Sequence, residues 1–86
     1  LAEALAAFGR ALSLDPGSAA ALNNRGLALL MLGQRDAAAG DFRAALRLNP
    51  CLFDAHRNLG RLQIRTEPPG DCRFTPEQRA ALAETR

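Results

Sequence analysis

Residues 3–16, EALAAFGRALSLDP, are similar to residues 37–50, AAAGDFRAALRLNP, which begin 34 residues later. The first stretch carries the residues that recur, which are Ala4, Phe8, Ala11, Leu12, Leu14 and Pro16. The same offset holds beyond the proline, where the aligned pairs are Ala21 and Ala55, Asn24 and Asn58, and Gly26 and Gly60. A fixed period of this length is typical of stacked helical repeats, which usually act by binding.

The spacing of apolar residues predicts helices, and prolines and glycines mark their ends. We expect helices over residues 1–14, about 19–32, 36–48 and about 53–65. Ser18 is a candidate N-cap for the second of these helices, and Gly33 is placed to close it. Asp15-Pro16-Gly17 and Asn49-Pro50 stop the first and third helices.

A long loop and a short terminal helix are predicted after the fourth helix. Residues 66–75 contain Pro68-Pro69-Gly70, which cannot continue a helix. Thr75, Pro76 and Gln78 then form the pattern of a capping box with proline at the first helical position. The sequence therefore predicts a last helix over residues 76–86.

Length and composition restrict the class of protein. A chain of 86 residues holds at most one domain, and so small a body buries only about 60% of the surface that its unfolded form exposes. The formal net charge of +2 is too small to indicate nucleic acid, and no apolar run approaches the roughly 20 residues of a membrane span. Because the sequence begins at Leu1 in mid-repeat, we expect a piece of a longer polypeptide. We expect an intracellular protein, with the cytoplasm as the first candidate.

The two cysteines, Cys51 and Cys72, are expected to be free thiols. One lies at a turn between repeats and the other in the long loop, with a predicted helix of about 13 residues, or roughly 20 Å, between them. A disulfide requires a Cα separation of at most about 7 Å, so none is expected. Their spacing matches no zinc site, and the acidic residues are scattered, so no metal or cofactor is predicted.

The period and its residues resemble tetratricopeptide repeats. The residues that carry the resemblance are Pro16, Gly26, Ala38, Phe42, Ala45, Pro50 and Gly60. The resemblance implies an all-α solenoid of antiparallel helix pairs with about two and a half repeats. Residues 1–16 would be the second helix of a truncated repeat, 19–52 a complete repeat, and 53–86 a divergent repeat with an internal loop at 66–75 and a terminal helix at 76–86.

The third repeat departs from the family's pattern. His56 stands where the family prefers a large apolar residue, Gln63 replaces an aromatic residue or leucine, and the internal turn is much longer than usual. His56 is expected to be a packing residue with a polar tip. Residues 76–86 are interpreted as a displaced second helix or as a cap on the open end of the stack, with a disordered tail as the alternative.

The resemblance also implies where a ligand would bind, since the first helices of such repeats line a concave groove. Asn24 and Asn58 resemble the asparagines that contact extended peptides, and Asn23 lies beside them. An amide side chain can pair with both groups of a peptide unit, so a ladder every 34 residues would suit a peptide backbone. The alternative is that each asparagine caps a helix or meets water.

Three arginines define the expected ligand more closely. Arg57, Arg61 and Arg65 are spaced i, i+4, i+8 and would form one stripe on the fourth helix, beside Asn58. Guanidinium groups bind carboxylates and phosphates, so an acidic, phosphorylated or C-terminal segment is a candidate ligand. A solvated face whose Arg stems cover apolar surface is the alternative.

Enzymatic function is not expected, because the single histidine and the two serines, Ser13 and Ser18, offer no catalytic grouping. The carboxylate clamp of chaperone-binding relatives is not expected either. If Asn24 is its middle asparagine, Asp54 and Asn58 stand at the positions of its basic residues, and if Asn58 is, Asn23 and Leu27 stand where Lys and Asn should be. We therefore predict a non-catalytic protein-interaction module that binds a peptide partner, with neither nucleic acid nor membrane as a target. The alternatives are a structural segment of a longer superhelix, self-association of the isolated fragment and, less favoured, an RNA-binding repeat.

Overall fold

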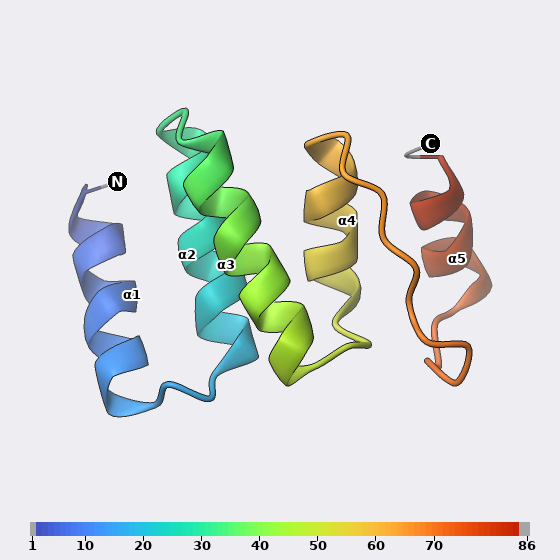
Figure 1. Ribbon diagram of the computed structural model, residues 1–86, viewed down its shortest axis with the longest axis horizontal. Coiled ribbons are helices and arrows are strands. Elements are labelled where there is room, and N and C mark those ends of the chain that lie inside the picture. The colour runs from blue at the N-terminus through green and yellow to red at the C-terminus, as the bar shows by residue number, and fades with distance from the viewer. Residues whose placement is uncertain (1, 85–86) are drawn as a thin grey trace.

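The computed structural model describes residues 2–84, which form five α-helices and no β-strand. The helices are α1 (Ala2–Leu14), α2 (Ala19–Met31), α3 (Arg35–Leu48), α4 (Phe53–Arg61) and α5 (Pro76–Ala83). The first four lie side by side and run in alternate directions, as Figure 1 shows. The predicted all-α stack of helix pairs is therefore confirmed. No helix in the described part of the chain has the length and apolar character needed to cross a membrane.

The contact between α2 and α3 rests on a glycine. Gly26 is buried, and a Cβ atom built there would lie 2.5 Å from Cε1 of Phe42, which has no exposed surface. Only a residue without a side chain lets the Phe42 ring reach the backbone of α2 at this point. Around this contact lies one core, made by Ala38, Ala39, Phe42, Leu59 and Leu62. Phe42, one of the residues that carry the repeat pattern, is thus a fully buried packing residue.

An ion pair on the same helix pair was not predicted. Arg25 of α2 donates from Nε and Nη2 to the two carboxylate oxygens of Asp41 on α3, at 2.7 and 2.8 Å. These hydrogen bonds raise the pKa of Arg25 above its ordinary value. Asp41 is buried, so the bidentate pair supplies the hydrogen bonds that a buried carboxylate requires.

The helix α4 ends earlier than the sequence predicts, at Arg61 instead of Arg65. Gln63 takes a left-handed conformation with φ of 65°, and its N–H donates to the carbonyl of Gly60 while Ile64 N–H donates to that of Leu59. The same pair of bonds closes α2, where Gly33 has φ of 81°. This is the Schellman pattern, and in α4 a glutamine occupies the position that usually favours glycine.

The loop after α4 runs back along that helix toward its beginning, and α5 then runs in the same direction as α4 (Figure 1). Cys72 is thereby brought to the turn before α4, where it forms a disulfide with Cys51 at a Cα separation of 5.4 Å. The prediction of two free thiols is wrong, because it placed the loop at the far end of α4. A loop that did not reverse would have left the two Cα atoms about one helix length apart, too far for a disulfide.

Two further contacts hold the returning loop against α4. The Nε2 atom of His56 lies 2.7 Å from the Pro50 carbonyl oxygen. Its Nδ1 atom lies 2.6 Å from the Thr66 hydroxyl oxygen. Because a carbonyl can only accept, Nε2 carries a proton. His56 is buried, which confirms that it packs inside the fold, and it joins the α3–α4 turn to the loop.

The helix α5 begins where the sequence predicts. The Thr75 hydroxyl accepts from Gln78 N–H, and the Gln78 side chain accepts from Thr75 N–H, which completes the capping box. Ser18 likewise caps α2 by accepting from Ala21 N–H. The predicted Thr85 and Arg86 end of the last helix lies outside the described residues.

Candidate functional site

A groove of about 220 Å³ lies between α2 and α4. Its lining consists of Asn23, Asn24, Leu27, Asp54, Arg57, Asn58 and Arg61. These residues meet because α2 and α4 are equivalent helices of the repeat, so an offset of 34 residues puts matching faces next to each other. Five of the six residues singled out as peptide-binding candidates thus line one groove.

The floor of the groove is a hydrogen bond between two asparagines. Asn58 Nδ2 donates to Asn23 Oδ1 at 3.0 Å, and both residues are buried. The bond pairs a buried donor of α4 with a buried acceptor of α2. Asn58 is thus buried and bonded within the fold, whereas Asn24 is exposed at the rim of the groove.

The two arginines of α4 form the basic side of the groove. Both Arg57 and Arg61 are exposed, and no acidic side chain of the described residues forms an ion pair with either. Arg61 Nη1 donates a long hydrogen bond, 3.4 Å, to Asn58 Oδ1. Most of the donor capacity of the two guanidinium groups consequently remains available to a ligand.

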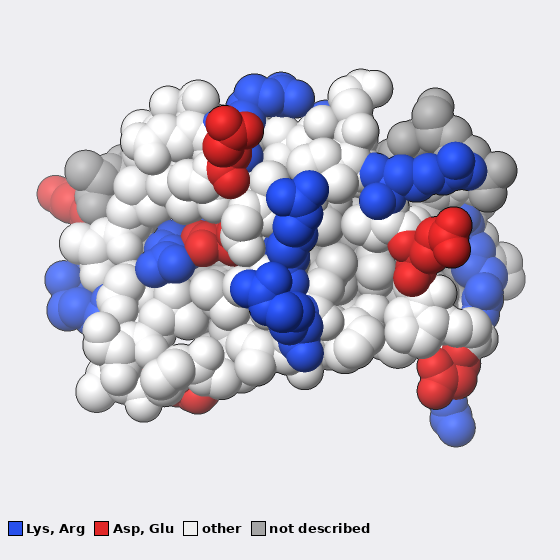
Figure 2. Space-filling view, in the orientation of Figure 1, with Lys and Arg blue, Asp and Glu red and all other residues white. Residues whose placement is uncertain are grey.

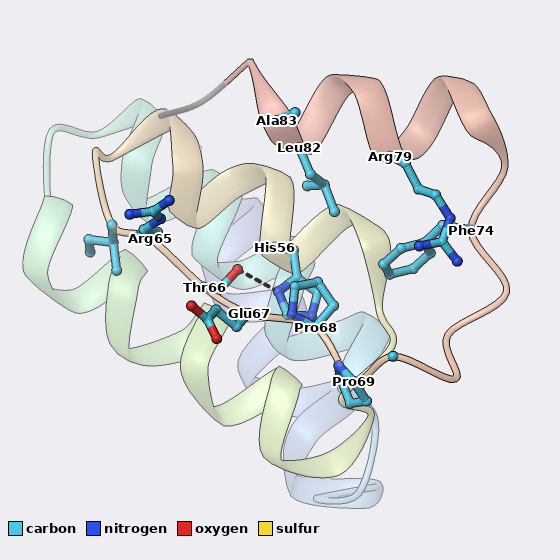
Figure 3. A pocket seen from close by; sticks show the side chains of 12 residues that line it. His56, Arg65, Thr66, Glu67, Pro68, Pro69, Phe74, Arg79, Leu82 and Ala83 are labelled. Carbon is cyan, nitrogen blue, oxygen red and sulfur yellow. Dashed lines mark hydrogen bonds between the residues drawn. The ribbon is translucent and has the colours of Figure 1, made fainter.

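Arg65 does not belong to this groove. It follows the end of α4 and lines a different cavity, beside Thr66 and Glu67 (Figure 3). The predicted stripe of three arginines on one helix is therefore wrong, because the Schellman turn at Gln63 ends the helix before the third arginine.

Two lining residues, Asp54 and Leu27, were not among the predicted peptide-binding residues. Asp54 lies three residues before Arg57 and four before Asn58, and Leu27 lies four residues after Asn23. Helical spacing of i, i+3 and i+4 from the predicted residues would have found both. Asp54 gives the groove one acidic side chain beside two basic ones, and Leu27 gives it an apolar patch.

The face drawn in Figure 2 carries charge of both signs. Figure 2 shows basic side chains in a column over α3 and its junction with α4, with acidic side chains in separate small groups. Arg25 is neutralised by Asp41. That pair is the one ion pair found among residues 2–84, so the groove arginines share their unpaired state with the other arginines of this part of the chain and differ from them in lining a hollow.

One cluster of possible metal ligands occurs among residues 2–84. The side-chain ligand atoms of Cys51, Asp71 and Cys72 lie within 4.8 Å of one another. The two sulfur atoms are bonded to each other, so in this state neither is a thiolate that could bind an ion.

Comparison with known proteins agrees with the repeat. The tetratricopeptide repeat family model matches residues 19–50. A TPR repeat-containing thioredoxin of Arabidopsis thaliana is 39% identical over 64 residues, which are 74% of this chain and 9% of that protein. A small glutamine-rich tetratricopeptide repeat-containing protein of Mycosarcoma maydis is 35% identical over 57 residues, 66% of this chain and 16% of that protein.

A third relative is a tetratricopeptide repeat and J domain-containing co-chaperone of Cryptococcus neoformans var. grubii. It is 42% identical over 50 residues, which are 58% of this chain and 10% of the co-chaperone. The chain thus spans less than a fifth of each of these relatives. No solved structure matches it significantly.

Proposed function

Because the chain belongs to the tetratricopeptide repeat family, a family of protein-interaction modules, we propose that it binds an extended peptide segment in the groove between α2 and α4. The observation that carries this proposal is the gathering of Asn24, Arg57 and Arg61 around one hollow, where neither arginine forms an ion pair with an acidic residue of the described chain. The function is binding without catalysis.

In this proposal Arg57, Arg61 and Asn24 contact different groups of the ligand. Arg57 and Arg61 stand one turn apart on α4, so both guanidinium groups can reach a carboxylate or phosphate of the ligand. Asn24 has an exposed amide that can pair with a peptide unit. Asn23 and Asn58 hold the floor in place, and in this proposal they do not contact the ligand themselves.

The ligand is proposed to be acidic at the α4 side of the groove. Asp54 opposes this preference at the beginning of α4, since a second carboxylate placed next to it would be repelled. An acidic side chain of the peptide should therefore lie toward Arg61, away from Asp54. A basic side chain could lie beside Asp54, which would fix the direction in which the peptide runs.

The relatives support protein partners in general terms. One is named as a co-chaperone and another as a thioredoxin that contains such repeats, and each is far longer than the matched segment. Their names say nothing of a ligand for this groove. The choice of an acidic peptide rests on the arginines alone.

The proposal is tested by mapping where peptides bind. Unstructured peptides of equal length and opposite net charge are added to the isotopically labelled protein, and amide shifts are followed by two-dimensional NMR. Acidic peptides should move the resonances of Asn24, Arg57 and Arg61 in a saturable way, and Arg43→Gln on α3 should leave binding unchanged. Shifts confined to other surfaces, or equal shifts with basic peptides, would refute the groove assignment.

A further inference from the structure

A second cavity, of about 340 Å³, lies between α4, the returning loop and α5 (Figure 3). It shares no lining residue with the groove between α2 and α4. Its volume lies within the range of about 300–1,000 Å³ that is usual for small-molecule sites. The proposed peptide binding makes no use of this cavity.

One side of the cavity is apolar and well held. Phe74 packs edge-on against Phe53 and His56, with ring centroids 5.8 and 6.3 Å apart. Both nitrogens of His56 are bonded elsewhere, to Pro50 and Thr66, so its ring offers mainly carbon to the cavity. Leu82 points from α5 into the same space in Figure 3. The wall can therefore receive an aromatic or branched hydrocarbon group.

A cation borders this apolar wall. Arg79 reaches from α5 toward Phe74, and its Nη2 donates to the Cys72 carbonyl at 3.1 Å. That bond fixes the guanidinium, while no carboxylate of residues 2–84 is ion-paired with it. Its remaining donors can still bind an anion. Arg65 lies on the other side of the cavity, where the carboxylate of Glu67 opposes its charge.

The loop that closes the cavity is fastened at two points. The disulfide joins Cys72 to Cys51, and the Thr66 hydroxyl bonds to His56. Since Arg79 bonds to the Cys72 carbonyl, the same fastening positions the cation. A site held in this way loses little conformational entropy when a ligand enters.

From this combination we propose that the cavity binds a small carboxylate with an aromatic or branched apolar body. The carboxylate accepts hydrogen bonds from Arg79, and the body packs on Phe74, His56 and Leu82. On the opposite side Arg65 and Glu67 carry charges of opposite sign, so Arg79 is the cation that this proposal assigns to the carboxylate.

The test uses 3-phenylpropionate, with 3-phenylpropanol as the neutral control of the same shape. NMR titration should give saturable shifts at Phe74 and Leu82 with a dissociation constant on the order of 1 mM, as expected for so small a ligand. The alcohol should bind about tenfold more weakly, because it cannot make the charge-assisted bond. Equal affinity for the two compounds, or no saturable shift with either, would overturn the proposal.

Variants separate binding from folding. Arg79→Gln should weaken binding about tenfold, but it also removes the bond to Cys72 and could loosen α5. Ala83→Phe fills the cavity from an exposed position and should abolish binding, whereas Ala80→Phe on the same helix, outside the lining, should not. If Ala83→Phe binds 3-phenylpropionate as well as the unmodified protein does, the site lies elsewhere and the proposal fails.

Discussion

Asn58 donates a hydrogen bond from its side-chain amide to the side-chain oxygen of Asn23, at 3.0 Å, between residues 35 positions apart. The bond joins the equivalent helices of neighbouring repeats at the floor of the groove. Asn24, the residue that stands 34 positions before Asn58, is exposed instead. The adjacent asparagines of α2 therefore have different roles: Asn23 is bonded inside the fold, and Asn24 lies at the surface.

Replacing Asn23 by alanine should cost about 1–3 kcal/mol of stability, because the buried amide of Asn58 then loses its acceptor. Asn24→Ala is the matched control and should change the free energy of unfolding by no more than about 0.5 kcal/mol. Urea denaturation of the two variants measures the difference. Equal losses would mean that the bond between Asn23 and Asn58 contributes nothing.

Two glycine replacements should have opposite effects. Gly26→Ala should destabilise the protein by about 1–3 kcal/mol, since its Cβ would meet the fully buried Phe42 ring at 2.5 Å. Gly40→Ala on α3 meets nothing within 4 Å and should stabilise by about 0.5–1 kcal/mol, as alanine favours helix. Thermal unfolding of the two variants should show a lower melting temperature for Gly26→Ala and a higher one for Gly40→Ala. If Gly26→Ala leaves the melting temperature unchanged, the observed packing of Phe42 on α2 is contradicted.

The two helix ends with the same hydrogen bonds offer another paired test. Gln63→Gly should stabilise by up to about 1 kcal/mol, because glycine adopts a φ of 65° without steric cost. Gly33→Ala should destabilise by about 1 kcal/mol for the converse reason. A loss of stability in Gln63→Gly would show that the glutamine side chain has a role beyond the turn.

Reduction of the disulfide between Cys51 and Cys72 should lower the free energy of unfolding by roughly 3 kcal/mol. This is the stabilisation expected when a cross-link with a sequence separation of 21 restricts the unfolded chain. Amide exchange should rise first in α5, which has no buried residue of its own. The Cys51→Ser/Cys72→Ser variant should have the same free energy of unfolding as the reduced protein. Adding a reductant should not change the stability of this variant. Non-reducing mass spectrometry that finds two free thiols in the native protein would refute the pairing.

Local signals in the sequence predicted most of the fold correctly. Ser18 and the box of Thr75 and Gln78 cap their helices, and Phe42 lies in the core. Such features depend on neighbours one turn away or on the period itself, so they can be read from spacing. The groove residues on α2 and α4 came together for the same reason.

The errors arise where distant segments decide the outcome. The early end of α4 depends on a left-handed glutamine, which no propensity favours, and which Ile64 supports by packing on the core. The disulfide depends on a loop reversal that Thr66 secures through His56. The burial of Asn58 depends on Asn23 of another repeat. Each of these outcomes depends on a tertiary contact or on a rare backbone conformation, so spacing alone could not reveal them.

The central claim is that the groove binds an acidic peptide through Arg57 and Arg61, and calorimetric titration at two salt concentrations, about 0.05 and about 0.5 M, tests it most directly. Arg57→Ala and Arg61→Ala should each weaken binding at low salt by about 1.5–3 kcal/mol, and the difference should shrink at high salt. Asn24→Ala should cost less and should keep its effect at both concentrations. An affinity for acidic peptides that changes neither with salt nor with either arginine substitution would contradict this claim. So would the absence of any binding of acidic peptides.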